Sequence, residues 1–522
     1  MTAVPDVHLP AAANRFGVLI AGLMMFAIFA TWSLATARYG GPDEPAHVLR
    51  AASVASGDLL GRPGPGLEPG YRSVLVPVAL TTGDPSCFRH DEDTAATCAV
   101  EDPAATGSAR ASSSAGNYPP LYYALVGVPV RLLGDESKVL WYRLVAAFWS
   151  ALALTVAAAR SRRFVASLLV VCITPASWFL FGIVNPNALE IALAVVAWVG
   201  VERVRTSAVV PTMADVGWIA GPIAIAIVIR PVAALTWGAM VGVLVVSLWR
   251  RPASAKLPLA RRGILYGLPM VAVLIAIAWN VWAGVAVRDS RTAAEMPFLR
   301  SLWRAIDEST ETWREMAGSL GWLEFSAPWI AHVIWWSIAG IAAWLALGGN
   351  TRLRLAWFWV LAVFVAGPIA FEVVFVSSVG FIWQGRYSIP TGIGLMVVGI
   401  DTWRRRLTRR TISVVVGFGA AAQVATLWVV LQRYTTGADG SWWFRNSAWQ
   451  PPLPPVLLLG ADCVLLVGLL WIANRGSVGA FGDDGSVGAF GDLAPYDVER
   501  GTGAEPLDLL RAERVEACEI EG

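Results

Sequence analysis

The chain has few charged side chains for its length. Only 15% of its 522 residues are charged and 56% are hydrophobic, a composition that excludes an ordinary soluble protein and indicates an integral membrane protein. The formal net charge of +2 offers no basic excess for a nucleic-acid partner. Residues 16–36 contain no charge and are longer than a signal-peptide core, so we expect a retained transmembrane helix there.

Long apolar runs dominate the rest of the chain. Twelve of them are within or near the length that crosses the hydrocarbon core: 16–36, 139–159, 164–181, 187–203, 216–230, 232–249, 263–284, 328–348, 355–376, 387–401, 411–431 and 453–473. A shorter run, 118–133, contains three prolines and is interpreted as juxtamembrane or re-entrant. The sequence therefore predicts an all-α integral membrane protein with about twelve transmembrane helices.

Lys and Arg are distributed unevenly between the two sets of loops. They concentrate in the turns 160–163, 203–205, 250–262, 352–354 and 404–410, which the positive-inside rule places in the cytoplasm. This orientation puts both termini in the cytoplasm and makes two long loops, 37–138 and 285–327, face outward. We therefore expect a cytoplasmic N-terminus over 1–15, a polytopic domain over 16–475 and a cytoplasmic tail over 476–522, in the cell membrane.

The tail and the second long loop have recognisable patterns. The tail contains a tandem copy of GSVGAFGD, at 476–483 and 485–492, which predicts a flexible segment, with a short helix near 506–516. A phosphate-binding role for its glycines lacks the strand and the Lys that such a loop requires. In the outward loop 285–327, residues 298–306 would place apolar side chains on one face of a helix and charged side chains on the other. This pattern predicts an amphipathic helix that lies on the bilayer.

Cysteine is scarce, and two of the five lie in the first outward loop. Cys87 and Cys98 flank a polar stretch, and in an oxidising space they can form a disulfide. A metal site formed by these thiols with His90 and Asp91 is the weaker interpretation, because the cysteine spacing is too wide for a typical thiolate pair.

Acidic, imidazole and amide side chains gather at the outward ends of the apolar runs. Asp43, Glu44 and His47 follow the first run, where Pro42 and Pro45 stiffen the turn and a helix can start at Glu44. Asp43 could simply cap that helix. The other members of the outward group are Asn117, Tyr118, Tyr122, Tyr123, Asn185, Asn187, Arg230, Gln384, Arg386 and Tyr387.

An outward acid near an outward arginine suits the transfer of a group from a lipid-linked phosphate to a hydroxyl. The acid accepts the proton of the attacking hydroxyl, and the guanidinium holds the phosphate as negative charge develops on it. Asp43 is the first choice for the acid and Arg386 for the phosphate contact. Arg386 and Arg230 could instead reach lipid headgroups without any role in chemistry.

Four motifs carry a resemblance to a known family: GPDEPAHVLRA from Gly41, NYPPLYY from Asn117, GWLE from Gly321 and QGRYSIP from Gln384. They resemble the bacterial predicted multi-spanning membrane proteins called domain of unknown function 2142, over residues 15–475. That family in turn is similar to the GT-C glycosyltransferases, which use polyprenyl-phosphate sugars.

The resemblance implies a GT-C-like fold and an enzyme that moves a sugar to a cell-envelope glycan or lipid. It assigns Asp43 to activate the acceptor, with Glu44 and His47 beside it, and Arg386 to the lipid phosphate. Tyr387, Gln384, Arg230, Asn117, Tyr118 and Tyr122 are the remaining candidates for substrate binding. Glu324 stands where an Asp is expected and receives no role.

Two other classes stay open. A transporter or flippase of lipid-linked precursors would also have about twelve spans, but it typically shows charges near mid-membrane and internal repetition. Asp462 is the only acid near the middle of a predicted span, and the two halves show no repeat. A non-enzymatic scaffold for envelope assembly would tolerate replacement of Asp43. A divalent cation is compatible with the transfer reaction, but no motif indicates one.

Overall fold

The computed structural model describes residues 11–64, 67–68, 70–102, 104–161, 172–207, 209–249, 257–285 and 296–478. The chain divides into two units, Met1–Ser477 and Val478–Gly522. Apart from Val478, the second unit lies outside the described residues, and with it both the predicted helix near 506–516 and most of the tandem repeat.

Long apolar helices form most of the first unit. Within the described residues, seven segments are long and apolar enough to cross a membrane. They belong to α1 (Ala11–Ala35), α4 (Val139–Arg160), α11 (Leu268–Ala283, continuous with α10, Leu259–Arg262, and η4, Gly263–Gly267), α14 (Trp329–Leu347), α15 (Thr351–Val379), α18 (Arg409–Thr436) and α19 (Pro455–Val478). All seven correspond to predicted spans, which confirms the helical membrane fold.

The other predicted spans are shorter or broken. Helices α6 (Pro175–Phe181) and α7 (Pro186–Thr206) meet at an angle of 118°. Helices α8 (Met213–Ile229), α9 (Ala233–Leu248) and α16 (Gly385–Val397) have 17, 16 and 13 residues, and α17 (Ile400–Arg406) follows α16. The number of spans, twelve, therefore stays a prediction. Residues 164–171 of the third predicted span lie outside the described part.

The two long loops contain more regular structure than the sequence indicated. The first holds α2 (Glu44–Ala55), α3 (Pro120–Leu133) and a two-stranded sheet in which β1 (Arg72–Pro77) pairs antiparallel with β2 (Ser108–Ser113). The second holds α12 (Phe298–Asp307), α13 (Ser309–Gly318) and the short pair β3 (Ser319–Leu320) and β4 (Phe325–Ser326). The predicted amphipathic helix is confirmed in α12, and the few short strands lie in the loops of an otherwise helical fold.

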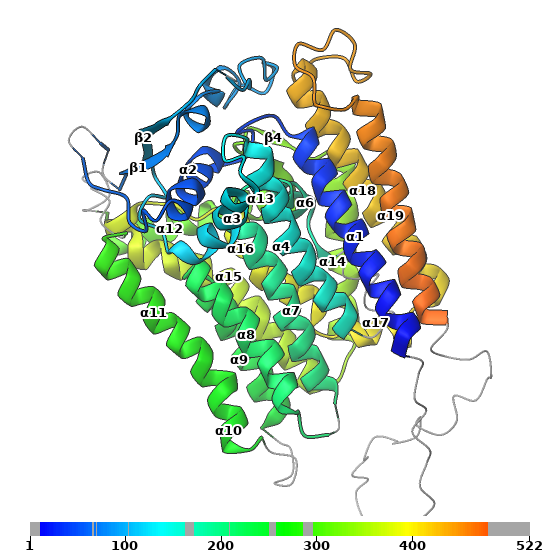
Figure 1. Cartoon of the computed structure of the whole chain (residues 1–522). Coiled ribbons are helices and arrows are strands. Elements are labelled where there is room, and N and C mark those ends of the chain that lie inside the picture. Colours follow the sequence, from blue (N-terminus) through cyan, green and yellow to red (C-terminus); the bar gives the residue numbers. More distant parts are fainter. Residues whose placement is uncertain are drawn as a thin grey trace, which may run out of the picture. The chain divides into compact units, whose positions relative to one another are not determined.

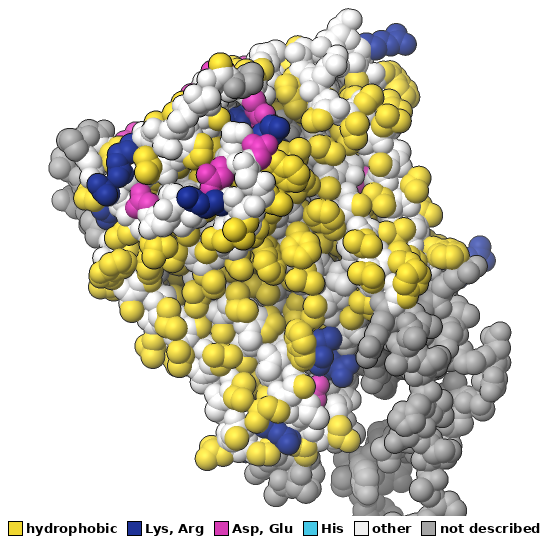
Figure 2. Space-filling view, in the orientation of Figure 1, with side chains coloured by type: hydrophobic (Ala, Val, Ile, Leu, Met, Phe, Trp, Pro, Cys, Tyr) yellow, Lys and Arg dark blue, Asp and Glu magenta, His cyan; other side chains and the backbone are white. Residues whose placement is uncertain are grey.

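Both loops lie at the same end of the long helices (Figure 1). Helices α2, α12 and α13 and the strands gather there, whereas α10, α17 and the first residues of α1 lie at the opposite end. This separation agrees with loops that share one side of a membrane. The face in Figure 2 is mostly hydrophobic over the long helices, and many of its charged side chains gather near the loop end.

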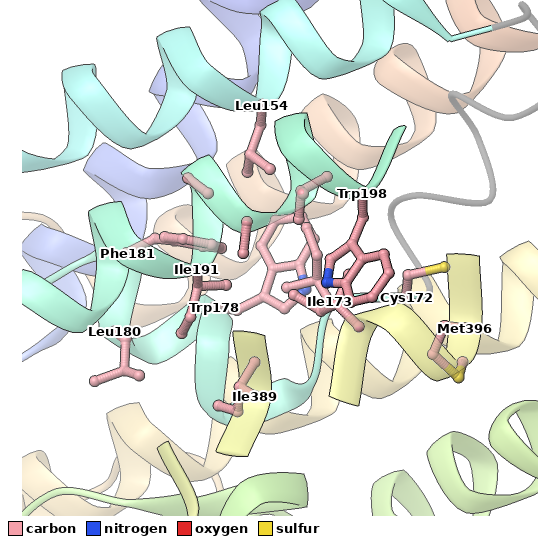
Figure 3. Close-up of a cluster of buried hydrophobic side chains, with 14 of the residues drawn as sticks. Leu154, Cys172, Ile173, Trp178, Leu180, Phe181, Ile191, Trp198, Ile389 and Met396 are labelled. Carbon is pink, nitrogen blue, oxygen red and sulfur yellow. The ribbon is translucent and has the colours of Figure 1, made fainter. Parts of the chain in front are cut away.

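The core beneath the loops is packed by aromatic and aliphatic side chains from α6, α7 and α16 (Figure 3). Trp178 and Trp198 are fully buried, and the indole N–H of Trp198 donates to the Pro390 carbonyl at 2.9 Å. Pro390 lies inside α16, so this bond joins α7 directly to the backbone of α16. The contact fixes α16 against α7, and both helices begin at the loop end.

A buried arginine attaches the first loop to α18. Arg433 is 1% exposed and donates to the carbonyls of Phe88, Asp91 and Thr94 at 2.6 to 2.8 Å. These carbonyls lie between Cys87 and Cys98, which form the predicted disulfide. Arg433 also approaches Glu324 at 3.5 Å. The cysteine loop thus folds as a cap on the loop end of α18.

Removal of this disulfide should destabilise the cap. In the chain-entropy model, bridging a loop of this length contributes about 3 kcal/mol. The double substitution Cys87→Ser and Cys98→Ser should therefore lower the apparent melting temperature of the purified protein, whereas Cys463→Ser, which alters an unbridged exposed thiol, should not. Mass spectrometry with and without reductant checks the bond, and finding both thiols free in protein prepared without reductant would contradict it.

Candidate functional site

Asp43 lies on a strained turn directly before α2. Its φ of 59° and ψ of 7° are in the left-handed region, which Asp and Asn tolerate better than most residues. The helix starts at Glu44 as predicted, but the Asp43 side chain makes no capping hydrogen bond. Asp43 thus occupies the N-cap position of α2, but its side chain does not cap the helix. The carboxylate instead reaches across the fold to α16.

Arg386 is the partner of Asp43. Its Nη2 donates to Asp43 Oδ2 at 2.6 Å, joining residues 343 positions apart. The Arg386 side chain is 7% exposed, whereas that of Asp43 is 45% exposed. The pair thus has a buried guanidinium and a carboxylate open to the surface. The structure brings together the two residues that the sequence placed at the centre of the site.

The Arg386 guanidinium retains unused hydrogen-bond donors. Its Nε and Nη1 are buried and have no hydrogen-bond partner among the described residues. Buried donors are nearly always paired in proteins, because an unmet group loses its water without compensation. Charged guanidinium donors bind carboxylates and phosphates well. The site is therefore equipped to accept an anion beside Asp43.

Arg230 adds a second cation. The guanidinium carbons of Arg230 and Arg386 lie 4.7 and 5.3 Å from the centroid of the Tyr387 ring, and Arg386 Nη2 is 3.4 Å from the Tyr387 hydroxyl. Arg230 Nε is also 3.7 Å from Glu190 Oε2. Two arginines thus converge on one tyrosine next to Asp43, and all three residues are sequence candidates for substrate binding.

The segment before Arg386 is fixed by acids from neighbouring helices. The Gly385 amide donates to Glu315 of α13 at 2.7 Å, and the amides of Ile382 and Trp383 donate to Glu372 of α15. A side chain at Gly385 would collide with the α13 backbone, so glycine is required for this close approach. Gln384 precedes α16, and its buried Oε1 has no partner among the described residues.

His47 lies one turn along α2 from Asp43. Its Nδ1 is 3.0 Å from the hydroxyl of Tyr123, a residue adjacent to the candidate Tyr122. Burial is the largest influence on its pKa; Arg230 and Arg386 lower the pKa further and Asp43 raises it, with a net value of about 3. The imidazole is therefore neutral near pH 7, and His47 can orient or relay a proton but adds no positive charge.

Asp43 is ionised at the same pH. Burial by itself raises its pKa, but the charge of Arg386, together with its hydrogen bond to the carboxylate and the charge of Arg230, more than offsets this and holds the pKa below the usual range. A carboxylate is therefore present to accept a proton from a substrate.

Lowering the pH should destabilise the protein, because the folded state holds the His47 imidazole neutral. The folded pKa lies below the unfolded value, so His47 contributes stability above about pH 6.5, and this contribution is lost as pH falls toward 3. Below pH 6.5 the loss approaches about 1.4 kcal/mol per pH unit. From pH 7 to pH 5, the apparent melting temperature of the wild type should therefore fall by more than that of His47→Gln. A pH-independent difference would contradict it.

Glu44 faces away from this site. It is fully buried and forms a two-bond ion pair with Arg143 of α4, with distances of 2.6 and 2.7 Å. Arg143 also donates to the carbonyls of Ser33, Thr36 and Ala37 at the end of α1. The pair closes the turn that carries Asp43, so its contacts favour a structural role for Glu44 rather than the predicted place beside the base.

The remaining candidates surround the site at varying distance. Asn117 is buried and connects to α11: its side chain donates to Gly284, and its carbonyl accepts from Trp279. The Tyr118 ring lies 6.4 Å from that of His47. Tyr122 is buried against Tyr123. Of these three, Tyr118 lies next to the imidazole, Asn117 joins two segments, and Tyr122 packs behind Tyr123.

Two residue groups were missed in the sequence. Arg143 is a charge inside a predicted span, which is itself a signal of function or of pairing. Glu190, near the start of α7, pairs with Arg230 and is not among the sequence candidates. Among the described residues, no group of three or more His, Cys, Asp or Glu side chains could hold a metal ion.

Comparisons with known proteins define the class and then the family. The chain has the helices of an integral membrane protein, and residues 26–395 match the family model described as predicted membrane protein DUF2142. The chain belongs to that family, as the motifs indicated. The match includes Asp43 and Arg386 but ends before α18 and α19.

The solved structures that match the chain include one at low sequence identity. It is ArnT from Cupriavidus metallidurans, crystallised with undecaprenyl phosphate, with a TM-score of 0.43 and 14% sequence identity over 90% of this chain and 78% of that one. No curated protein matches the chain.

Proposed function

We propose that this protein is a membrane glycosyltransferase that moves a sugar from a polyprenyl-phosphate donor to a cell-envelope acceptor on the outer face. The observation that carries the proposal is the Asp43–Arg386 pair, in which a surface-open carboxylate contacts a buried guanidinium that retains two unpartnered donors. The candidate base and the candidate anion site are thus in direct contact with each other. The GT-C resemblance of the motifs is consistent with this chemistry.

The reaction follows from the placement of these groups. A hydroxyl of the acceptor approaches Asp43 and transfers its proton to the carboxylate as its oxygen bonds to the anomeric carbon of the sugar. The bond from that carbon to the phosphate oxygen breaks, and its electron pair leaves with the polyprenyl phosphate. Arg386 stabilises the charge that develops on the phosphate, and Arg230 adds to the positive field.

Three helix starts reinforce this field. Asp43 directly precedes α2, Arg386 lies in the first turn of α16, and Asn185 precedes α7. Asn185 Nδ2 donates to the Pro42 carbonyl at 3.1 Å, so α7 begins next to the Asp43 turn. Helix N-termini carry partial positive charge, and their convergence favours an anion.

Donor turnover tests the proposal. Purified protein in nanodiscs is given undecaprenyl-phosphate sugars and envelope lipid acceptors, and release of undecaprenyl phosphate is measured. Arg386→Lys keeps the charge but loses the planar fork, so its donor KM should rise by about tenfold or more. Arg131→Lys, at a half-exposed arginine of α3, is the matched control and should not change.

Other outcomes discriminate the alternatives. Movement of labelled lipid between leaflets of proteoliposomes without release of the phosphate would favour a flippase. The absence of both release and movement, with normal envelope assembly by an Asp43→Asn strain, would favour a scaffold.

A further inference from the structure

The start of α7 contains two buried acceptor atoms without partners. Asn187 is fully buried and Glu190 is 1% exposed. Neither Asn187 Oδ1 nor Glu190 Oε1 has a hydrogen-bond partner among the described residues. Such acceptors are uncommon in folded proteins and require an explanation.

The local contacts fix the direction of both atoms. Asn187 Nδ2 donates to Glu190 Oε2 at 3.0 Å, and this bond assigns the amide so that its oxygen faces away from the carboxylate. Glu190 Oε2 is also the oxygen nearest to Arg230, at 3.7 Å. Asn187 and Glu190 thus each use one side-chain polar atom in these contacts and keep one acceptor oxygen unused. Both side chains are held in place before any ligand arrives.

This acceptor pair is connected to the anion site. Arg230 contacts Glu190 on one side and the Tyr387 ring on the other, and Arg386 lies against the same ring. In the series of contacts Glu190–Arg230–Tyr387–Arg386, the unused acceptors therefore stand at one end and the unused donors of Arg386 at the other, among the described residues. A ligand that satisfies both sides needs hydrogen-bond donors at one end and an anion at the other.

We infer that Asn187 and Glu190 form the subsite that binds the hydroxyl groups of the donor sugar, next to the phosphate held by Arg386. A sugar phosphate has the required polarity: its hydroxyls donate to the amide and carboxylate oxygens, and its phosphate accepts from the guanidinium. The inference rests on the proposed function and adds the residues that distinguish one sugar from another. A site built to accept hydrogen bonds rejects ligands that lack the matching hydroxyl.

The purely structural alternative is that Glu190 serves only to neutralise Arg230. In that case the carboxylate affects the binding of any phosphate equally, through Arg230, whether or not a sugar is attached. A sugar subsite and a purely structural role therefore predict different ratios between the affinity for the sugar-linked lipid and the affinity for the bare lipid phosphate.

The experiment measures the binding of undecaprenyl phosphate and of several undecaprenyl-phosphate hexoses to the full chain in nanodiscs. The hexose lipid that the wild type binds most tightly is then used for the variants. Glu190→Gln and Asn187→Ala should weaken binding of the hexose lipid by about tenfold and leave binding of bare undecaprenyl phosphate within about twofold of wild type. Glu190→Gln keeps the size of the side chain, and the melting temperature of each variant reports its folding.

Glu202→Gln is the matched control. Glu202 is a buried carboxylate near the other end of α7, paired with Arg205 at 2.6 Å, and its replacement should leave both affinities unchanged. Equal weakening of both lipids by Glu190→Gln, or no weakening of either, overturns the inference and leaves the proposed donor class intact. A wild type that binds none of these lipids overturns the donor class, and the sugar subsite with it.

Discussion

Asp43→Asn should lower the rate of sugar transfer by about 10²- to 10⁴-fold and leave the protein folded. The amide has the same shape as the carboxylate and tolerates the left-handed backbone of this turn, but it cannot take up a proton. It can still accept the Arg386 hydrogen bond, although without the charge. The loss is therefore expected in kcat rather than in the amount of inserted protein.

Donor turnover in nanodiscs, with the apparent melting temperature measured in parallel, provides the test. Asp135→Asn is the matched control, because Asp135 is a partly exposed acid in the same long loop and pairs with Lys138 at 3.2 Å. A variant at Asp43 that turned over at nearly the wild-type rate would remove it as the base.

Arg143→Met should have the largest effect on stability. It leaves Glu44 as a buried charge without its partner and removes the donor for three carbonyls at the end of α1. Breaking a buried ion pair in this way costs about 3 to 5 kcal/mol. We expect little monodisperse protein after detergent extraction and a sharply lower melting temperature.

The double variant with Glu44→Gln separates the charge from the packing. Neutralising the acid should recover part of the stability lost in Arg143→Met, because no unpaired carboxylate remains. Arg131→Met changes an exposed arginine and should have little effect. If Arg143→Met were as stable as the wild type, the turn that carries Asp43 would not depend on the pair.

The two adjacent acids of this turn have different partners. Asp43 and Glu44 are neighbours in the sequence, but the left-handed turn and the helix start direct their side chains to different partners, Arg386 and Arg143. Residue type and spacing identify both as acids that follow the first apolar run. They do not determine which acid is enclosed, because that depends on where α4 and α16 pack.

The long apolar helices were predictable because twenty or so apolar residues have few alternatives to crossing a bilayer. The 118° bend between α6 and α7 was not, since prolines such as Pro186 mark a break but not its angle. The Asp43–Arg386 contact joins distant motifs, and sequence chemistry could group them on one side without pairing them. The unused acceptor oxygens of Asn187 and Glu190 could not be predicted from the sequence, because they depend on three-dimensional contacts alone.

The most direct test of the central claim is a cryo-electron microscopy map of the wild-type protein in nanodiscs with undecaprenyl phosphate. The account predicts phosphate density within hydrogen-bond distance, about 3 Å, of Arg386 Nε or Nη1, beside the Asp43 carboxylate. Phosphate density bound elsewhere, with the Asp43–Arg386 pair unchanged and its donors still unoccupied, would contradict it.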